Sequence, residues 1–133
     1  MYQTKKIHYK TIFKQDGQSE TIEYKADALL KVGDVNHLIF DCQDGTIHIQ
    51  YSKDNVILSH GESVLTFDYH KDVENLYQLP YGEAYLKTRL KSFKASPRNV
   101  KMVYELHDQQ GLLLTAYMMI QLFENCEAND ENI

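Results

Sequence analysis

The stretch Val100–Ile120, VKMVYELHDQQGLLLTAYMMI, decides the fold. Apolar and polar residues alternate on both sides of a central turn, which is the pattern of two strands that each bury one face. A three-residue loop with Gly111 at the left-handed bulge position would join these strands into a hairpin. That register pairs apolar residues with one another: Leu106–Leu114, Tyr104–Ala116, Met102–Met118 and Val100–Ile120. The stretch therefore predicts an antiparallel sheet.

Three further turns predict hairpins whose faces agree in the same way. Asp16-Gly17 and Asp44-Gly45 are typical of two-residue type I′ loops, and Gly61-Glu62 suits type II′. The predicted pairs are Ile7–Ala26, Tyr9–Tyr24 and Thr11–Ile22, then Leu38–Tyr51, Phe40–Ile49 and Cys42–Ile47, then Leu58–Leu65 and Val56–Phe67. Each register gathers apolar residues on one face, as a half-buried strand pair requires.

A fifth turn, Pro80-Tyr81-Gly82, breaks the chain between two more strands. Its register stays open at this point. A two-residue loop would place Tyr77 opposite Leu86, and a three-residue loop would place it opposite Tyr85.

These turns divide the chain into about ten strands, with no long helical pattern. The expected strands are 4–14, 19–26, 35–42, 46–52, 55–60, 63–69, 73–79, 83–93, 99–107 and 112–123. One short helical turn is expected near residues 26–31, ended by Gly33. This content predicts an all-β protein, an antiparallel closed barrel of eight to ten strands, because closure removes exposed strand edges. A two-sheet sandwich is the alternative.

Length and charge indicate one domain followed by a tail. A chain of 133 residues suits a single core, and the formal net charge is −5. Four acids and no base lie in residues 124–133, so the rest of the chain carries about −1. We therefore predict a barrel domain over residues 1–123 and a disordered acidic tail over 124–133.

Neither a membrane nor a secretory route is indicated. The sequence has no apolar run near the roughly 20 residues that span a bilayer, and its start leads into alternating residues. Cys42 and Cys126 lie far apart without a Cys-x-x-Cys pair, which argues against a disulfide scaffold. A cytoplasmic protein is expected.

Four segments carry a resemblance to a known family: Ile57-Leu58-Ser59-His60-Gly61, Leu65-Thr66-Phe67, Tyr77-Gln78-Leu79-Pro80-Tyr81-Gly82 and Lys87-Thr88. In this order they resemble the YwiB-like family of bacterial proteins, and the match extends to about Leu122. The resemblance implies a small calycin-type barrel, similar in architecture to lipocalins. It implies no biochemical activity, because the role of that family is not established.

The barrel interior is the leading candidate for a binding site. Its predicted lining, taken from the apolar faces, is Tyr9, Thr11, Tyr24, Phe40, Tyr51, Phe67, Leu86, Thr88, Tyr104 and Met118. Barrels of this size either fill with side chains or leave room for one small ligand, and both outcomes stay open here. The leading hypothesis is a non-catalytic barrel that binds a small apolar or amphipathic molecule.

A metal site is not expected, although three candidate ligands share one face. His37, Asp41 and His48 lie together in the predicted register, with Asp41 opposite His48. Zinc needs three or four converging ligands, which a flat sheet face rarely supplies. We expect no metal and no cofactor, and an Asp41–His48 charge pair that raises the affinity of the imidazole for a proton.

Catalysis is not expected either. Cys42 falls on an apolar face, as a small core residue does. His60 and Ser63 oppose each other across a turn, but the sequence indicates neither an acid nor an oxyanion device beside them.

The alternative hypothesis is an interaction module. Lys87, Arg89 and Lys91 form a basic patch on one face of strand 83–93, flanked by Tyr85 and Phe93. The last strand is apolar on both faces, so its second face is either buried under the cover of the barrel or exposed for a partner protein or a second copy. Both readings stay open here, and the chain is expected to be a monomer or a homodimer. Nucleic acid ranks below these partners, because the barrel domain is close to neutral.

Overall fold

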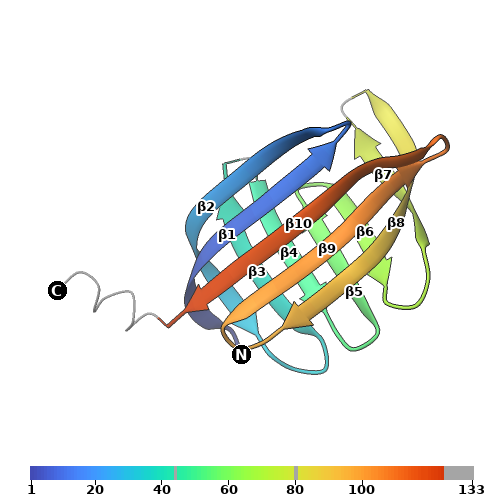
Figure 1. Cartoon of the computed structure of the whole chain (residues 1–133). Coiled ribbons are helices and arrows are strands. Elements are labelled where there is room, and N and C mark those ends of the chain that lie inside the picture. Colours follow the sequence, from blue (N-terminus) through green and yellow to red (C-terminus); the bar gives the residue numbers. More distant parts are fainter. Residues whose placement is uncertain (44, 80, 125–133) are drawn as a thin grey trace.

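Ten antiparallel strands form one sheet that curls into a nearly closed barrel (Figure 1). The computed structural model describes residues 1–43, 45–79 and 81–124. The strands are β1 (Gln3–Gln15), β2 (Gln18–Lys31), β3 (Asn36–Cys42), β4 (Gly45–Tyr51), β5 (Asn55–His60), β6 (Ser63–Asp68), β7 (Val73–Leu79), β8 (Gly82–Ala95), β9 (Asn99–Asp108) and β10 (Gly111–Phe123). Neighbours in sequence pair throughout, and β1 also pairs with β10, which gives the order β6-β5-β4-β3-β2-β1-β10-β9-β8-β7.

The barrel has two distinct ends. The turns β1–β2, β3–β4, β5–β6, β7–β8 and β9–β10 lie at one end, which we call the hairpin end. The N-terminus, the end of β10 and the four remaining turns lie at the other, the terminal end (Figure 1). This meander confirms the all-β antiparallel barrel predicted from the turn spacing.

The helical turn expected near residues 26–31 is wrong. Strand β2 continues to Lys31 and pairs with β1 on one side and with β3 on the other. Ala28 and Leu30 are buried while Leu29 is exposed, so alternate residues face the core. The backbone N–H and C=O groups of this segment are hydrogen-bonded to β1 and β3, and a helical turn would break the pairing with both strands.

Three of the predicted registers are confirmed. Strands β1 and β2 pair Tyr9 with Tyr24 around a loop in which Asp16 and Gly17 both have positive φ, 51° and 78°, as a type I′ turn requires. The β5–β6 register and the β9–β10 register also match, and β10 is bulged between Leu112 and Leu114.

Two registers differ from expectation. Strands β3 and β4 pair Leu38 with Ile49 and Cys42 with Gly45, so Gly45 is a strand residue and not a loop residue. Residue 44, the other half of the predicted loop, lies outside the described residues. This shift of two positions keeps every side chain on its predicted face, because the period of a strand is two.

Strands β7 and β8 pair Tyr77 with Ala84 and Leu79 with Gly82. Both predicted alternatives, Leu86 and Tyr85 opposite Tyr77, are therefore wrong. The reason is that Gly82 begins β8 and is not part of the connection.

A side-chain amide closes the seam between β6 and β7, the two ends of the sheet order. Asn75 Oδ1 accepts a hydrogen bond from the backbone N–H of Thr66 at 2.7 Å, and Asn75 Nδ2 donates to the Thr66 carbonyl at 3.3 Å. The Thr88 hydroxyl from β8 donates to the same carbonyl. Asn75 and Thr88 are both buried. The amide therefore pairs with the Thr66 backbone as a residue of a neighbouring strand would.

Aromatic and aliphatic side chains fill the middle of the barrel. Phe67, Leu38 and Ile49 are completely buried there. The rings of Phe67 and Tyr104 lie 4.9 Å apart between centroids in a tilted arrangement, which is a favourable geometry for aromatic pairs. The packed middle therefore leaves space for a cavity only toward the ends of the barrel.

Asn75→Ala is predicted to lower the free energy of unfolding by about 1–3 kcal/mol, because it leaves the half-buried Thr66 N–H without its partner and removes a buried amide from the seam. Urea denaturation measures the loss. The matched control is Asn99→Ala in β9, where the amide side chain makes no hydrogen bond within the described residues. Equal losses in the two variants would contradict the role of Asn75 at the seam.

Leu106→Ala is predicted to cost about 2–5 kcal/mol, because Leu106 is buried against the core opposite Leu114. Leu112→Ala, at a side chain that is 57% exposed, should cost far less. Thermal or urea unfolding compares the two. A negligible loss at Leu106 would show that this side chain does not pack in the core.

Candidate functional site

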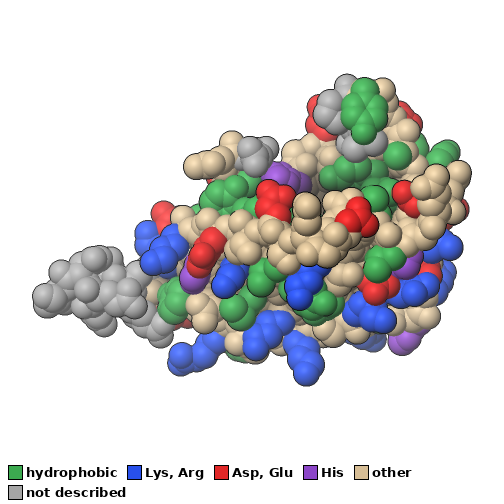
Figure 2. All heavy atoms as spheres, turned by 45° about the horizontal axis from the view of Figure 1, so that its top comes forward, with side chains coloured by type: hydrophobic (Ala, Val, Ile, Leu, Met, Phe, Trp, Pro, Cys, Tyr) green, Lys and Arg blue, Asp and Glu red, His purple; other side chains and the backbone are tan. Residues whose placement is uncertain are grey.

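A cavity of about 170 Å³ lies inside the hairpin end of the barrel. Figure 2 brings this end forward and shows hydrophobic side chains between the tips of the hairpins. The lining residues come from the inner faces of seven strands: Tyr9, Phe13, Ile47, Leu58, His60, Ser63, Leu65, Tyr77, Tyr104, Leu106 and Leu114. We call this space the mouth cavity.

Three phenol groups give the mouth cavity its polar character. Tyr104 is 4% exposed, and its hydroxyl makes no hydrogen bond to any residue that the structure describes. Burial raises the pKa of Tyr104 far above its ordinary value, and the nearby phenols of Tyr9 and Tyr77 raise it further. Tyr104 therefore stays a neutral O–H donor at every pH at which the protein would work.

The rim carries a histidine and a thiol. His60, at the end of β5, is paired with Ser63 of β6. Its Nε2 lies 3.6 Å from Sγ of Cys42, and that thiol also donates to the carbonyl of Gly45 at 3.2 Å. Cys42 is thus half-buried at the rim of the barrel and not deep in the core. No carboxylate is hydrogen-bonded to His60 among the described residues, so the rim lacks the acid that orients a catalytic histidine.

All ten residues predicted to line the interior face inward. Nine of them are buried, and Tyr24 is half-buried. The structure brings only Tyr9 and Tyr104 of that set to the mouth cavity, whereas Tyr51 lies at the terminal end. The others pack the middle, so the interior is filled at its centre and hollow at one end.

The sequence reasoning missed most of the cavity wall. Phe13, Leu58, His60 and Tyr77 line the cavity but were not among the predicted residues. The available signal was alternation: Phe13 is the next inward position after Thr11 on the way to the hairpin tip. Continuing each alternating face to its turn would have named these residues.

The candidate metal ligands do not converge. Asp41 pairs with Thr46 and accepts a hydrogen bond from its hydroxyl at 2.7 Å, so the predicted Asp41–His48 pair is wrong. Instead His37 Nδ1 lies 3.0 Å from His48 Nε2. Burial lowers the pKa of His48, and His37 lowers it further, which reverses the expected direction. Within the described residues, no three ligating side chains come together.

The basic patch on β8 is partly neutralised, and of its two predicted aromatic neighbours Tyr85 is exposed while Phe93 is not beside it. Arg89 binds both carboxylate oxygens of Asp72, at 3.0 and 2.9 Å, and its guanidinium lies 3.7 Å from Glu105. A bulge between Leu90 and Ser92 turns Phe93 into the barrel, 5.4 Å from the Tyr51 ring. The prediction that Phe93 flanks the basic face is therefore wrong. Lys87 and Lys91 are exposed, as predicted.

The outer face of β10 is partly exposed. Tyr117 is 40% and Met119 is 37% exposed, and the Lys14 ammonium lies 5.2 Å above the Tyr117 ring. The second apolar face of this strand is thus covered in part by side chains of the neighbouring strands.

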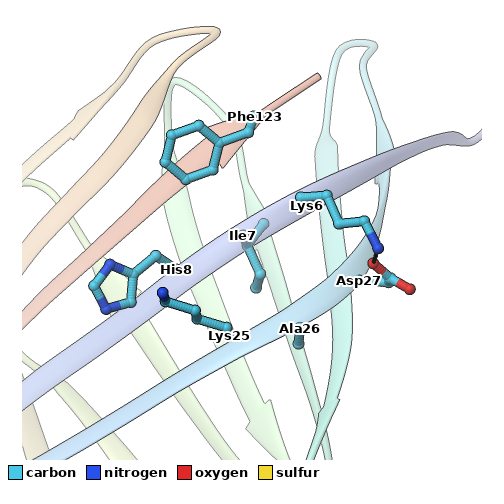
Figure 3. A pocket seen from close by; sticks show the side chains of 7 residues that line it. All are labelled: Lys6, Ile7, His8, Lys25, Ala26, Asp27 and Phe123. Atoms are coloured by element: carbon cyan, nitrogen blue, oxygen red, sulfur yellow. Dashed lines mark ion pairs between the residues drawn. The ribbon is translucent and has the colours of Figure 1, made fainter. Parts of the chain in front are cut away.

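Three larger hollows lie on the surface, and two of them show how such hollows differ in character from the mouth cavity. One, of about 500 Å³, lies over β1 and β2 beside Phe123, where Lys6 forms an ion pair with Asp27 and Lys25 lies opposite His8 (Figure 3). The other, of about 820 Å³, lies at the terminal end among turn residues. Both are lined in part by exposed charged side chains, whereas the mouth cavity is lined by the inner face of the barrel.

Comparison with solved structures finds the same architecture in the ywiB protein from Bacillus subtilis. The match has a TM-score of 0.70 over 90% of this chain and 92% of that chain, at 19% sequence identity. The chain is similar in fold to YwiB. At this identity the likeness shows the fold alone, so the barrel implied by the family resemblance is confirmed, while family membership and the calycin assignment stay predictions. No family model and no curated protein matches the sequence.

None of the described residues belongs to a helix long and apolar enough to cross a membrane.

Because burial raises its pKa, Tyr104 is predicted to stay protonated near pH 10, where tyrosines ordinarily ionise. Tyr104→Phe should therefore leave the tyrosinate absorbance step near that pH unchanged. The stabilisation linked to the raised pKa is fully present below about pH 10 and is lost as the pH rises. The control is the wild-type chain, whose absorbance step is measured under the same conditions. A smaller step in Tyr104→Phe than in the wild type would contradict the raised pKa of Tyr104.

Proposed function

We propose that this chain is a small-molecule-binding protein that holds one apolar or amphipathic ligand in the mouth cavity. The observation that carries the proposal is the chemistry of the lining: apolar walls from β1, β4, β5, β6, β9 and β10 surround the hydroxyl of Tyr104, which makes no hydrogen bond to another described residue. Apolar walls with a few placed polar groups are the usual composition of a ligand pocket.

The filled centre of the barrel defines how deep a ligand can enter. Phe67 and Tyr104 pack against each other below the cavity, and Tyr9 packs on Phe40 with 5.4 Å between ring centroids. A ligand would therefore rest on an aromatic floor and would not pass along the barrel axis. This arrangement differs from a hollow barrel, in which the whole interior would be available.

Access to the cavity comes from the hairpin end. His60 is exposed at the rim, and Leu58 and Tyr77 are half-buried below it. A ligand could enter between the hairpin tips without separating any pair of strands. The proposal contains no chemical step, since binding alone accounts for the lining.

The test is an NMR titration of the labelled protein with single-ring aromatic fragments, read at the amides of cavity residues. We expect shifts that cluster at Leu58, Tyr77 and Leu106. Leu58→Trp should abolish them, because the larger side chain occupies the cavity. The matched control Val64→Trp places the same side chain at a position that is 43% exposed, and it should leave binding unchanged.

Two outcomes would contradict the proposal. One is the absence of any fragment that shifts the cavity amides of the wild-type chain. The other is equal binding by wild type and Leu58→Trp, which would place the ligand elsewhere. Native mass spectrometry of the purified wild-type protein, searched for a retained small molecule, is an independent measurement.

A further inference from the structure

We infer that the mouth cavity selects a neutral, single-ring molecule that carries a hydroxyl or carbonyl oxygen. This inference rests on the proposed function and adds the chemical class of the ligand. Three properties of the lining lead to it: its lack of fixed charge, the position of its hydroxyl groups and its volume.

The lining has no fixed charge. None of its eleven residues is Lys, Arg, Asp or Glu, and the titratable imidazole of His60 is exposed at the rim beside Cys42. An ionised ligand would lose its hydration on entering and would find no counter-charge there. Burying an unpaired ion in this way is strongly unfavourable. Charged ligands are therefore selected against.

The polar group at the bottom of the cavity is a hydrogen-bond donor. Tyr104 lines the cavity as a neutral phenol in a largely apolar environment, and its hydroxyl makes no hydrogen bond to another described residue. A ligand oxygen that accepts from Tyr104 would gain a hydrogen bond inside the cavity. Tyr9 and Tyr77 lie near enough to interact electrostatically with Tyr104, so the ligand oxygen would enter a group of three phenols.

The volume limits the ligand to about one ring. A dry cavity of roughly 150 Å³ in another protein admits benzene, and the mouth cavity measures about 170 Å³. The side chains of Leu65, Leu106 and Leu114 offer flat apolar contact to such a ring. A ring with one or two small substituents fits these limits, and a fatty acyl chain or a fused multi-ring compound does not.

The experiment compares three probes of similar size on the full-length wild-type protein: toluene, 4-methylphenol and benzoate at neutral pH. Affinities are obtained from NMR titrations of the cavity amides. One additional hydrogen bond of ordinary strength predicts that 4-methylphenol binds about three- to tenfold more tightly than toluene. Benzoate is expected to show no binding at the same concentrations.

Tyr104→Phe should bring the affinities of 4-methylphenol and toluene together while toluene binding persists. The matched control is Tyr69→Phe, which removes a phenol hydroxyl at the terminal end, where it donates to the Ser52 carbonyl. The preference for 4-methylphenol should survive in that variant. The comparison of probes on the wild type needs no variant and stands even if Tyr104→Phe does not fold.

The outcomes separate this inference from the proposed function. Equal affinities of the wild type for toluene and 4-methylphenol, or tighter binding of benzoate, would overturn the inference and leave a binding cavity in place. A preference for 4-methylphenol that survives Tyr104→Phe would overturn the role of Tyr104. Failure of all three probes to shift any cavity amide would overturn the proposed function together with the inference.

Discussion

The contact of Asn75 with the backbone of Thr66 is the constraint on which the barrel depends. A ten-stranded sheet ends in two edges, and here those edges, β6 and β7, meet through a side-chain amide and the Thr88 hydroxyl. Closure hides both edges and covers Phe67, which lies one residue beyond Thr66. Leu65 and Tyr77, which line the mouth cavity, lie on these same two strands. The seam therefore fixes one wall of the candidate site.

Side-chain volume determines where the barrel is hollow. In the middle of the barrel, inward positions carry large rings that pack in pairs, Tyr9 on Phe40 and Phe67 on Tyr104. Toward the hairpin tips the inward side chains of β5 and β6 become Leu58, His60 and Ser63, which leave room between the walls. The same alternation that builds a packed core thus leaves a small site at its end.

Much of the fold could be predicted from local sequence, because turn residues and alternating faces are local properties. Asp16-Gly17 and Gly111 specified their registers, whereas Gly45 belongs to a strand and misled the pairing of β3 with β4. The consecutive apolar residues Ala28 to Leu30 suggested a helical turn, but they belong to strand β2, which pairs with both β1 and β3. The seam joins β6 with β7 and β8 through the side chains of Asn75 and Thr88. No sequence pattern within a single segment predicts such contacts between strands. For the site, alternation gave the inward face but not which end is open, because that depends on the side-chain volumes contributed by seven strands.

The seam also gives the barrel a place where it can open locally without unfolding. The amide proton of Thr66 is held by one side chain, and a rotation of Asn75 would release it to solvent exchange without separating any backbone ladder. Hydrogen exchange at this single amide would then report the opening of a slit beside the mouth cavity, while exchange in β1 and β10 reports unfolding of the whole sheet. The fold therefore provides, in one backbone position, a separate measure of how often its rim opens.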